Sequence, residues 1–192
     1  MEVAGTTGLD VMDAAAHAEL GLVDSLPRFR DLMGTDGRSY SASSFRDCRQ
    51  LVLIFVGNGC PSVKAYGDEL RRIQEAYGSR GAQLVAINSN RDYLSPADTY
   101  AEMVKVADAR GWGFPYLKDG DGNLAKGCGA LTTPHAFVFD GERKLRYRGR
   151  ITDSRDPSRA TSTDLTNALE DLQAGRPVEV PETQPIGCSI VW

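Results

Sequence analysis

A continuous apolar run at residues 51–56, Leu-Val-Leu-Ile-Phe-Val, is followed within a few residues by an amphipathic segment. A short run of branched and aromatic residues is typical of a strand that is buried on both faces. In the segment behind it, apolar side chains recur at alternating spacings of three and four, which is one face of a helix: Val63, Tyr66, Leu70, Ile73 and Tyr77. This strand–helix unit predicts an α/β core and places Cys60 at the junction.

Cys60 lies in or next to the first turn of the predicted helix, where free backbone N–H groups and the helix dipole stabilise a negative charge. Pro61 suits the first helical position because it has no N–H to leave unpaired. The thiolate is the reactive form of cysteine, so we predict that Cys60 is a nucleophile. Lys64, one turn further on, would favour the thiolate. The alternative is a small buried filler, since free cysteine is among the most buried residue types.

The composition narrows the class of protein. A chain of 192 residues with 41% apolar content can bury one good core. The net charge of −4 and the lack of a basic block argue against nucleic acid and membrane partners. The four cysteines match no zinc-ligand spacing and are too few for a disulfide scaffold. The first 24 residues do not have the pattern of a signal peptide, so we expect a cytoplasmic location.

The remaining pattern indicates alternating elements. We expect a hairpin over residues 29–40, a short helix at 43–46, a strand at 84–87 and a helix that begins at Ser95-Pro96. That helix would turn Tyr100, Val104 and Ala107 inward. Further strands are expected at 114–117, 136–139 and 145–148, and a last helix at 163–174. Strands that alternate with helices predict a parallel core, and the late hairpin adds an antiparallel edge.

Three stretches carry a resemblance to a known family: residues 58–66, Thr133-Pro134-His135, and the ending Gly-Cys-Ser-Ile-Val-Trp at 187–192. A cysteine at the start of the first core helix and a Thr-Pro pair ahead of a late strand resemble the thioredoxin fold. More closely, the chain resembles the redoxin branch that includes the alkyl-hydroperoxide-reductase and thiol-specific-antioxidant family. Its ending is similar to that of a subgroup of bacterial redoxin-domain proteins, which usually have a basic residue where Val191 stands.

The resemblance covers residues 25–192 and implies a thioredoxin-like α/β fold with a mixed central sheet and helices on both faces. We divide the chain into an N-terminal arm (1–24) with a short helix at 11–20, a redoxin domain (25–177) and a C-terminal tail (178–192). The tail would pack on or near the active site. The resemblance also implies a cis bond before Pro134, with the backbone of Thr133 positioning the substrate chain.

His135 follows that proline directly and has two interpretations. It could support Cys60 as an acid/base partner or by raising its thiolate character. Strand alternation could equally point it away from Cys60.

The chain departs from both signatures of this fold. A thioredoxin has a Trp before its first active-site cysteine and a second cysteine three residues on, where Gly59 and Val63 stand here. A peroxiredoxin has a proline and a threonine where Leu53 and Gly57 stand. A single-cysteine active site therefore remains, and its oxidised sulfur needs a second thiol to release it.

Three other cysteines could meet that need or serve only as packing. Cys188, in the apolar tail, is either a resolving thiol, acting within one chain or across a homodimer, or a packing residue. Cys128 lies a few residues before Pro134 and either approaches Cys60 or packs a helix end. Cys48 has no partner by spacing and is expected to be structural.

These residues predict a thiol-disulfide oxidoreductase of the redoxin type, with Cys60 as nucleophile and Cys188 as candidate resolving thiol. The alternatives are a one-cysteine peroxiredoxin-like thiol peroxidase and a redox-silent thioredoxin-fold binding module. The expected partners are a disulfide or peroxide substrate, and thioredoxin or a low-molecular-weight thiol as reductant. No cofactor is expected, and Lys64 would repel a metal held between Cys60 and His135.

Overall fold

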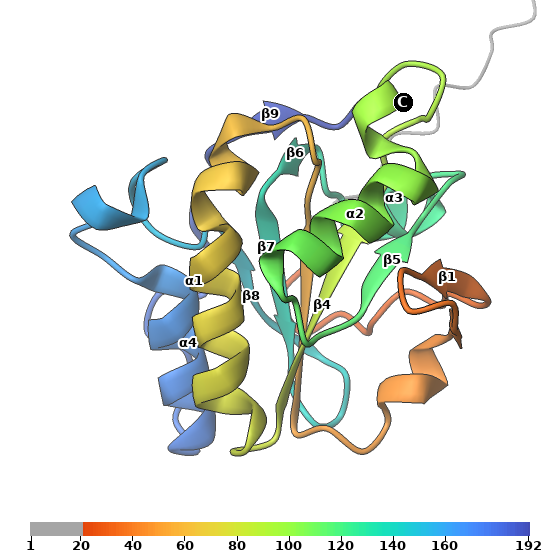
Figure 1. Cartoon of the computed structure of the whole chain (residues 1–192). Coiled ribbons are helices and arrows are strands. Elements are labelled where there is room, and N and C mark those ends of the chain that lie inside the picture. Colours follow the sequence, from red (N-terminus) through yellow and green to blue (C-terminus); the bar gives the residue numbers. More distant parts are fainter. Residues whose placement is uncertain (1–20) are drawn as a thin grey trace, which may run out of the picture.

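The computed structural model describes residues 21–192, which form a mixed sheet with helices on both faces (Figure 1). The strand order is β2-β1-β5-β4-β3-β7-β8. The strands are β1 (Leu32–Gly34), β2 (Ser39–Tyr40), β3 (Gln50–Phe55), β4 (Ala82–Asn88), β5 (Tyr116–Lys118), β7 (His135–Phe139) and β8 (Leu145–Gly149). The pairs β3–β4 and β4–β5 are parallel, and the other neighbouring pairs are antiparallel.

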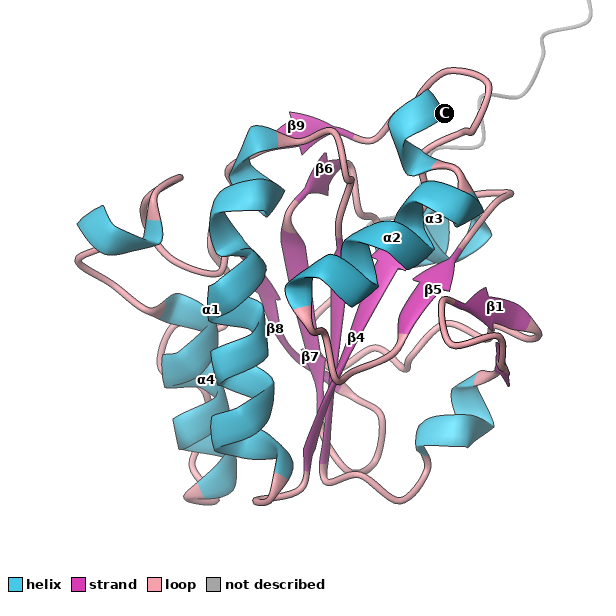
Figure 2. Ribbon diagram, in the orientation of Figure 1, coloured by secondary structure: helices cyan, strands magenta, loops and turns pink. Residues whose placement is uncertain are grey.

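Three α-helices share one face of the sheet. Side chains of α1 (Pro61–Gly78), α2 (Tyr100–Arg110) and α4 (Asp164–Gln173) enter one hydrophobic cluster. The short helix α3 (Asn123–Cys128) enters a second cluster on the opposite face, together with residues of the tail. A separate two-stranded ladder, β6 (Thr132–Thr133) with β9 (Cys188–Ser189), lies beside the N-terminal end of α1 (Figure 2).

The central strand β3 is buried along its whole length. Val52 and Ile54 enter the cluster under α1, whereas Leu51, Leu53 and Phe55 enter the cluster on the other face. Burial on both sides explains why this segment is a continuous apolar run instead of an alternating one.

The structure confirms the predicted thioredoxin-like architecture, but the second predicted helix begins later than expected. Pro96–Asp98 forms a turn of 3₁₀ helix, and α2 begins only after Thr99. The buried side chains of α2 are Met103 and Ala107, which lie one turn apart and pack in the first cluster, so Ala107 points inward as expected. Tyr100 and Val104, which were expected to point inward, are only half-buried.

Four short elements had no counterpart among the predicted ones: α3, β6, β9 and a turn of 3₁₀ helix at Pro157–Arg159. The buried carboxylate of Asp119 caps α3, accepting hydrogen bonds from the backbone N–H groups of Leu124 (3.2 Å) and Ala125 (3.0 Å). Most of the predicted N-terminal arm, including the helix expected at 11–20, lies outside the described residues. Among residues 21–192, none of the helices has the length and apolar character needed to cross a membrane.

We predict that Leu53→Ala lowers the free energy of unfolding by about 2–5 kcal/mol, because it leaves a cavity in a fully buried strand. Urea denaturation measures this loss. The matched control is Leu94→Ala, at a side chain that is 49% exposed. It should change stability by less than about 0.5 kcal/mol. Equal losses in the two variants would contradict the burial assigned to β3.

Candidate active site

Cys60 caps the N-terminus of α1, at the carboxyl end of the buried strand β3. Its backbone carbonyl accepts the hydrogen bond from the N–H of Lys64 (3.0 Å), and Pro61 occupies the first helical position. Its own N–H donates to the carbonyl of Gly57 (3.1 Å), which closes the loop between strand and helix. The thiol is therefore next to the unpaired N–H groups at the start of an 18-residue helix.

The tail brings Cys188 directly to this thiol. The Sγ atoms of Cys60 and Cys188 are 2.7 Å apart, and both cysteines are free thiols in this structure. The ladder between β6 and β9 sets this approach, since it pairs Thr133 with Cys188 and Thr132 with Ser189. The Cys60 thiol also donates to the carbonyl of Thr133 (3.2 Å), and the bond from Thr133 to Pro134 is cis. The Cys60 thiol thus contacts both strands of the ladder, at the position where Thr133 pairs with Cys188.

The tail is anchored on the upstream side of Cys188. Glu182 forms an ion pair with Arg148 (2.9 Å). The backbone N–H of Thr183 donates to the carbonyl of Arg148 (3.0 Å), and the N–H of Arg148 donates to the carbonyl of Pro181 (3.0 Å). This segment of the tail therefore lies along the edge strand β8.

The tail is also anchored downstream of Cys188. Ile190 is buried in the second cluster, and its N–H donates to the carbonyl of Leu131 (2.9 Å). The N–H of Val191 donates to the side-chain oxygen of Asn90 (2.8 Å). The ring of Trp192 lies under the ammonium of Lys126, 5.4 Å from it. With anchors on both sides, Cys188 has a fixed position beside Cys60.

The two thiols are electrostatically unequal. Burial raises the pKa of Cys60, but hydrogen bonds from Cys188, the backbone N–H of Val63 and the Thr133 side chain outweigh it, so the pKa lies below its usual range. Burial, the hydrogen bond with Cys60 and the charge of Cys60 raise the pKa of Cys188 to about 11. Cys60 is consequently the thiol of the pair that loses its proton first, and Cys188 remains protonated near neutral pH.

A buried carboxylate that the sequence did not single out holds this site together. Asp98 is 1% exposed and accepts four hydrogen bonds. Three of them come from the backbone N–H of Asn58 (2.6 Å) and the side-chain amides of Asn88 (2.7 Å) and Asn90 (2.9 Å). The fourth comes from the hydroxyl of Ser95 (2.5 Å). Since Asn58 belongs to the Cys60 loop and Asn90 binds the tail, Asp98 connects both sides of the thiol pair.

Gly57 stands where a peroxiredoxin has a threonine. A Cβ atom there would lie 2.6 Å from the side-chain nitrogen of Asn90 and 3.5 Å from the hydroxyl of Thr133. The Asn90 amide therefore takes up the space in which a side chain at position 57 would lie. The packing around Asp98 therefore favours glycine at position 57 over the threonine of a peroxiredoxin.

The side chains of the other residues proposed from the sequence have different surroundings. Lys64 is exposed, and its carbonyl accepts a hydrogen bond from Arg110 (3.2 Å). Cys128 is fully buried in the second cluster, on the opposite face of the sheet from Cys60, and burial raises its pKa. Cys48 donates to the carbonyl of Phe45 (3.0 Å). Of the expected site residues, Cys60, Thr133 and Cys188 are brought together.

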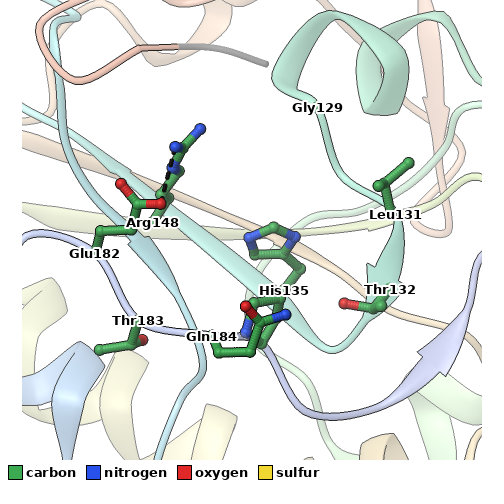
Figure 3. Close-up of a pocket in the computed structure, with 9 residues that line it drawn as sticks. Gly129, Leu131, Thr132, His135, Arg148, Glu182, Thr183 and Gln184 are labelled. Carbon is green, nitrogen blue, oxygen red and sulfur yellow. Dashed lines mark hydrogen bonds and ion pairs between the residues drawn. The ribbon is translucent and has the colours of Figure 1, made fainter. Parts of the chain in front are cut away.

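His135 lines a separate pocket of about 230 Å³, beside Thr132 and Arg148 (Figure 3). Glu182 of the tail forms part of its wall. Burial, together with the positive charge of Arg148, lowers the pKa of His135 to about 4, so the imidazole is neutral at pH 7. Its supporting role toward Cys60 stays a prediction. Within residues 21–192, no cluster of three His, Cys, Asp or Glu side chains is arranged to hold a metal ion.

We predict that Cys188→Ala raises the pKa of Cys60, because it removes the side chain that hydrogen-bonds to the thiolate. The thiolate fraction at pH 7 then falls, and alkylation of Cys60 by iodoacetamide slows. The pH dependence of the alkylation rate, followed on the Cys60 peptide, measures the shift. Cys48→Ala is the control and should keep the wild-type midpoint. An unchanged midpoint in Cys188→Ala would contradict the proposed hydrogen bond.

We predict that Asp98→Ala destabilises the protein by about 3 kcal/mol or more, because it leaves buried donors without an acceptor. Asp92→Ala is the control, since Asp92 is half exposed and forms a single ion pair with Lys118 (2.6 Å). That change should cost less than about 1 kcal/mol. Urea denaturation compares the two, and similar costs would argue against Asp98 as the buried centre of this network.

Comparison with known proteins supports the fold and identifies the family. The chain is 33% identical to a hypothetical protein of Sinorhizobium meliloti, with a TM-score of 0.85 and coverage of 91% of this chain and 96% of the other. It is 37% identical to an uncharacterised conserved protein of Geobacillus kaustophilus, with a TM-score of 0.83 over 91% and 94% of the two chains. The peroxidoxin BcpB of Mycobacterium tuberculosis shares the fold at 20% identity, with a TM-score of 0.64 over 82% and 99%.

A thiol:disulfide interchange protein of Yersinia pestis is 26% identical over 127 residues. That match covers 64% of this chain but only 61% of the relative, which is less than two thirds of its length. The redoxin family itself matches residues 23–169, from before β1 into α4. The matched range includes Cys60, Asp98 and the Thr133-Pro134 bond. Because this match spans most of the chain, the protein belongs to the redoxin family.

Proposed function

We propose that the protein is a thiol-disulfide oxidoreductase of the redoxin type, in which Cys60 is the nucleophile and Cys188 is the resolving thiol. The observation that carries the proposal is the 2.7 Å separation of the two sulfur atoms within one chain. A disulfide bond is about 2.0 Å long, so a small movement of either side chain would form it. The names of the thiol:disulfide interchange relative and of the peroxidoxin neighbour support the same class of chemistry.

The proposed reaction begins at the Cys60 thiolate. It attacks one sulfur of a disulfide substrate and expels the other as a thiolate, which leaves a mixed disulfide on Cys60. Cys188 then loses its proton and attacks the Cys60 sulfur, which releases the remaining half of the substrate as a thiolate. With a hydroperoxide, the Cys60 thiolate attacks the terminal oxygen, the O–O bond breaks, and an alcohol leaves, so that Cys60 becomes a sulfenic acid. Attack by Cys188 on that sulfur then releases water. Either route ends in a Cys60–Cys188 disulfide, and two electrons have passed to the substrate.

When the Cys60–Cys188 disulfide is reduced, the reductant has a preferred sulfur to attack. A thiolate reductant attacks more readily where the sulfur is accessible and where the leaving thiol has the lower pKa. Cys188 is the more exposed of the two cysteines, and Cys60 has the lowered pKa. Attack at Cys188 with Cys60 as leaving group is therefore favoured. The reductant we propose is thioredoxin or a low-molecular-weight thiol, in the reducing environment of the cytoplasm.

The two alternative functions make different demands on the site. A one-cysteine peroxidase would need only Cys60 at its active site, whereas here a second thiol lies 2.7 Å from it. A redox-silent binding module would have no use for a second thiol in contact with Cys60. The contact also forms within one chain, so a homodimer is not needed to resolve Cys60. These observations favour the two-cysteine oxidoreductase.

The test is disulfide mapping by mass spectrometry after mild oxidation with diamide. We expect one link, between the peptides that contain Cys60 and Cys188, and its complete loss in Cys188→Ser. Cys128→Ser is the control and should still form the link, since Cys128 lies in the opposite cluster. A stable free thiol at Cys60 in the oxidised wild type would refute the proposal and favour the binding module.

A further inference from the structure

The tail lies along the strand edge at which an extended polypeptide substrate could reach Cys60. We infer that the docked tail excludes polypeptide disulfides and restricts the thiolate to low-molecular-weight oxidants. This inference rests on the proposed reactivity of Cys60 and names the substrate class of the same site. It follows from how residues 187–192 fill the space beside β6.

An extended peptide binds a protein most simply by adding a strand to an open sheet edge, where backbone hydrogen bonds hold it. Next to Cys60, the strand with such an edge is β6, whose Thr133 carbonyl lies 3.2 Å from the thiol. That edge is already paired, because Thr133 is in register with Cys188 and Thr132 with Ser189. A substrate strand would have to displace the tail before it could align a disulfide with Cys60.

The fit of the tail to β6 depends on a residue without a side chain. A Cβ atom at Gly187 would overlap the carbonyl of Thr133 and lie 3.0 Å from the nitrogen of Pro134. Both contacts are to backbone, which cannot rotate out of the way. The close approach of the two chains therefore requires glycine at position 187, and a larger residue would push the tail off this edge.

Cys60 is also shielded from large molecules by burial, since it is 5% exposed. A small oxidant needs only a brief opening of the side chains around it. A polypeptide needs the whole ladder open and the Ile190 and Val191 contacts broken, because its chain must lie where the tail lies. The size of the oxidant, more than its charge, would thus decide whether it reaches Cys60.

The experiment compares two activated disulfides with the same leaving group. The small probe is 2,2′-dithiodipyridine. The large probe is an extended hexapeptide whose central cysteine carries a 2-pyridyl disulfide. In each case the Cys60 thiolate attacks the sulfur that does not carry the departing pyridine ring. The S–S bond of the probe breaks, and pyridine-2-thione leaves. Cys188 then displaces the half of the probe bound to Cys60. Absorbance of the pyridine-2-thione gives the rate, and mass spectrometry confirms that Cys60 has reacted by finding it in the Cys60–Cys188 disulfide.

We expect the reduced wild type to react at Cys60 with the small probe at least tenfold faster than with the peptide probe. Gly187→Ala should raise the peptide rate at least tenfold and the small-probe rate less than threefold. Gly113→Ala is the matched control, because a Cβ there meets no atom within 4 Å, and it should behave as wild type. Equal rates for both probes in the wild type would overturn the inference.

A second variant covers the case in which Gly187→Ala does not fold, as judged by its circular dichroism. A chain that ends after Ser189 keeps Cys188 but lacks the contacts made by Ile190, Val191 and Trp192. It should gain the same access to the peptide probe. A folded variant of either kind with no gain in peptide rate would also overturn the inference. Failure of the proposed function would be seen separately, as an oxidised wild type without a Cys60–Cys188 link.

Discussion

The arrangement of both thiols depends on the hydrogen bonds that the buried carboxylate of Asp98 accepts. One of its oxygens accepts from the backbone of Asn58, two residues before Cys60, and the other from Asn90, whose side-chain oxygen accepts from the tail. A buried charge is costly unless it is fully hydrogen-bonded, so these donors cannot be moved independently of one another. The same requirement leaves no space for a side chain at Gly57.

Much of the fold could be predicted because its main elements have regular patterns of apolar residues. The apolar run at residues 51–56 and the helical spacing from Val63 to Tyr77 predict a buried strand and its helix, which the structure contains as β3 and α1. The position of Cys60 follows from the junction between them. These features are local, so propensity and periodicity are sufficient to predict them.

The strand pairing that holds the tail could not be predicted in the same way. That the tail would pack near the active site was expected from the family resemblance, and not from periodicity. β6 and β9 have two residues each, which is too short for any alternation, and their pairing joins segments more than fifty residues apart. In the sequence, Asp98 stands just after Ser95-Pro96, where the second helix was expected to begin. Its hydrogen-bond donors lie in the Cys60 loop and in the segment from the end of β4 to Ser95, and these two segments approach each other only in the folded chain.

The ladder between β6 and β9 also has a kinetic consequence. Folding has already removed the translational and rotational freedom of Cys188 relative to Cys60, which intermolecular thiols must lose at the moment of reaction. Well-oriented groups of this kind react as if present at effective concentrations on the order of 10⁵ M or more. Once Cys60 is oxidised, closure by Cys188 would outrun capture by thiols at millimolar concentration. The sulfur would then be protected from further, irreversible oxidation by its own chain.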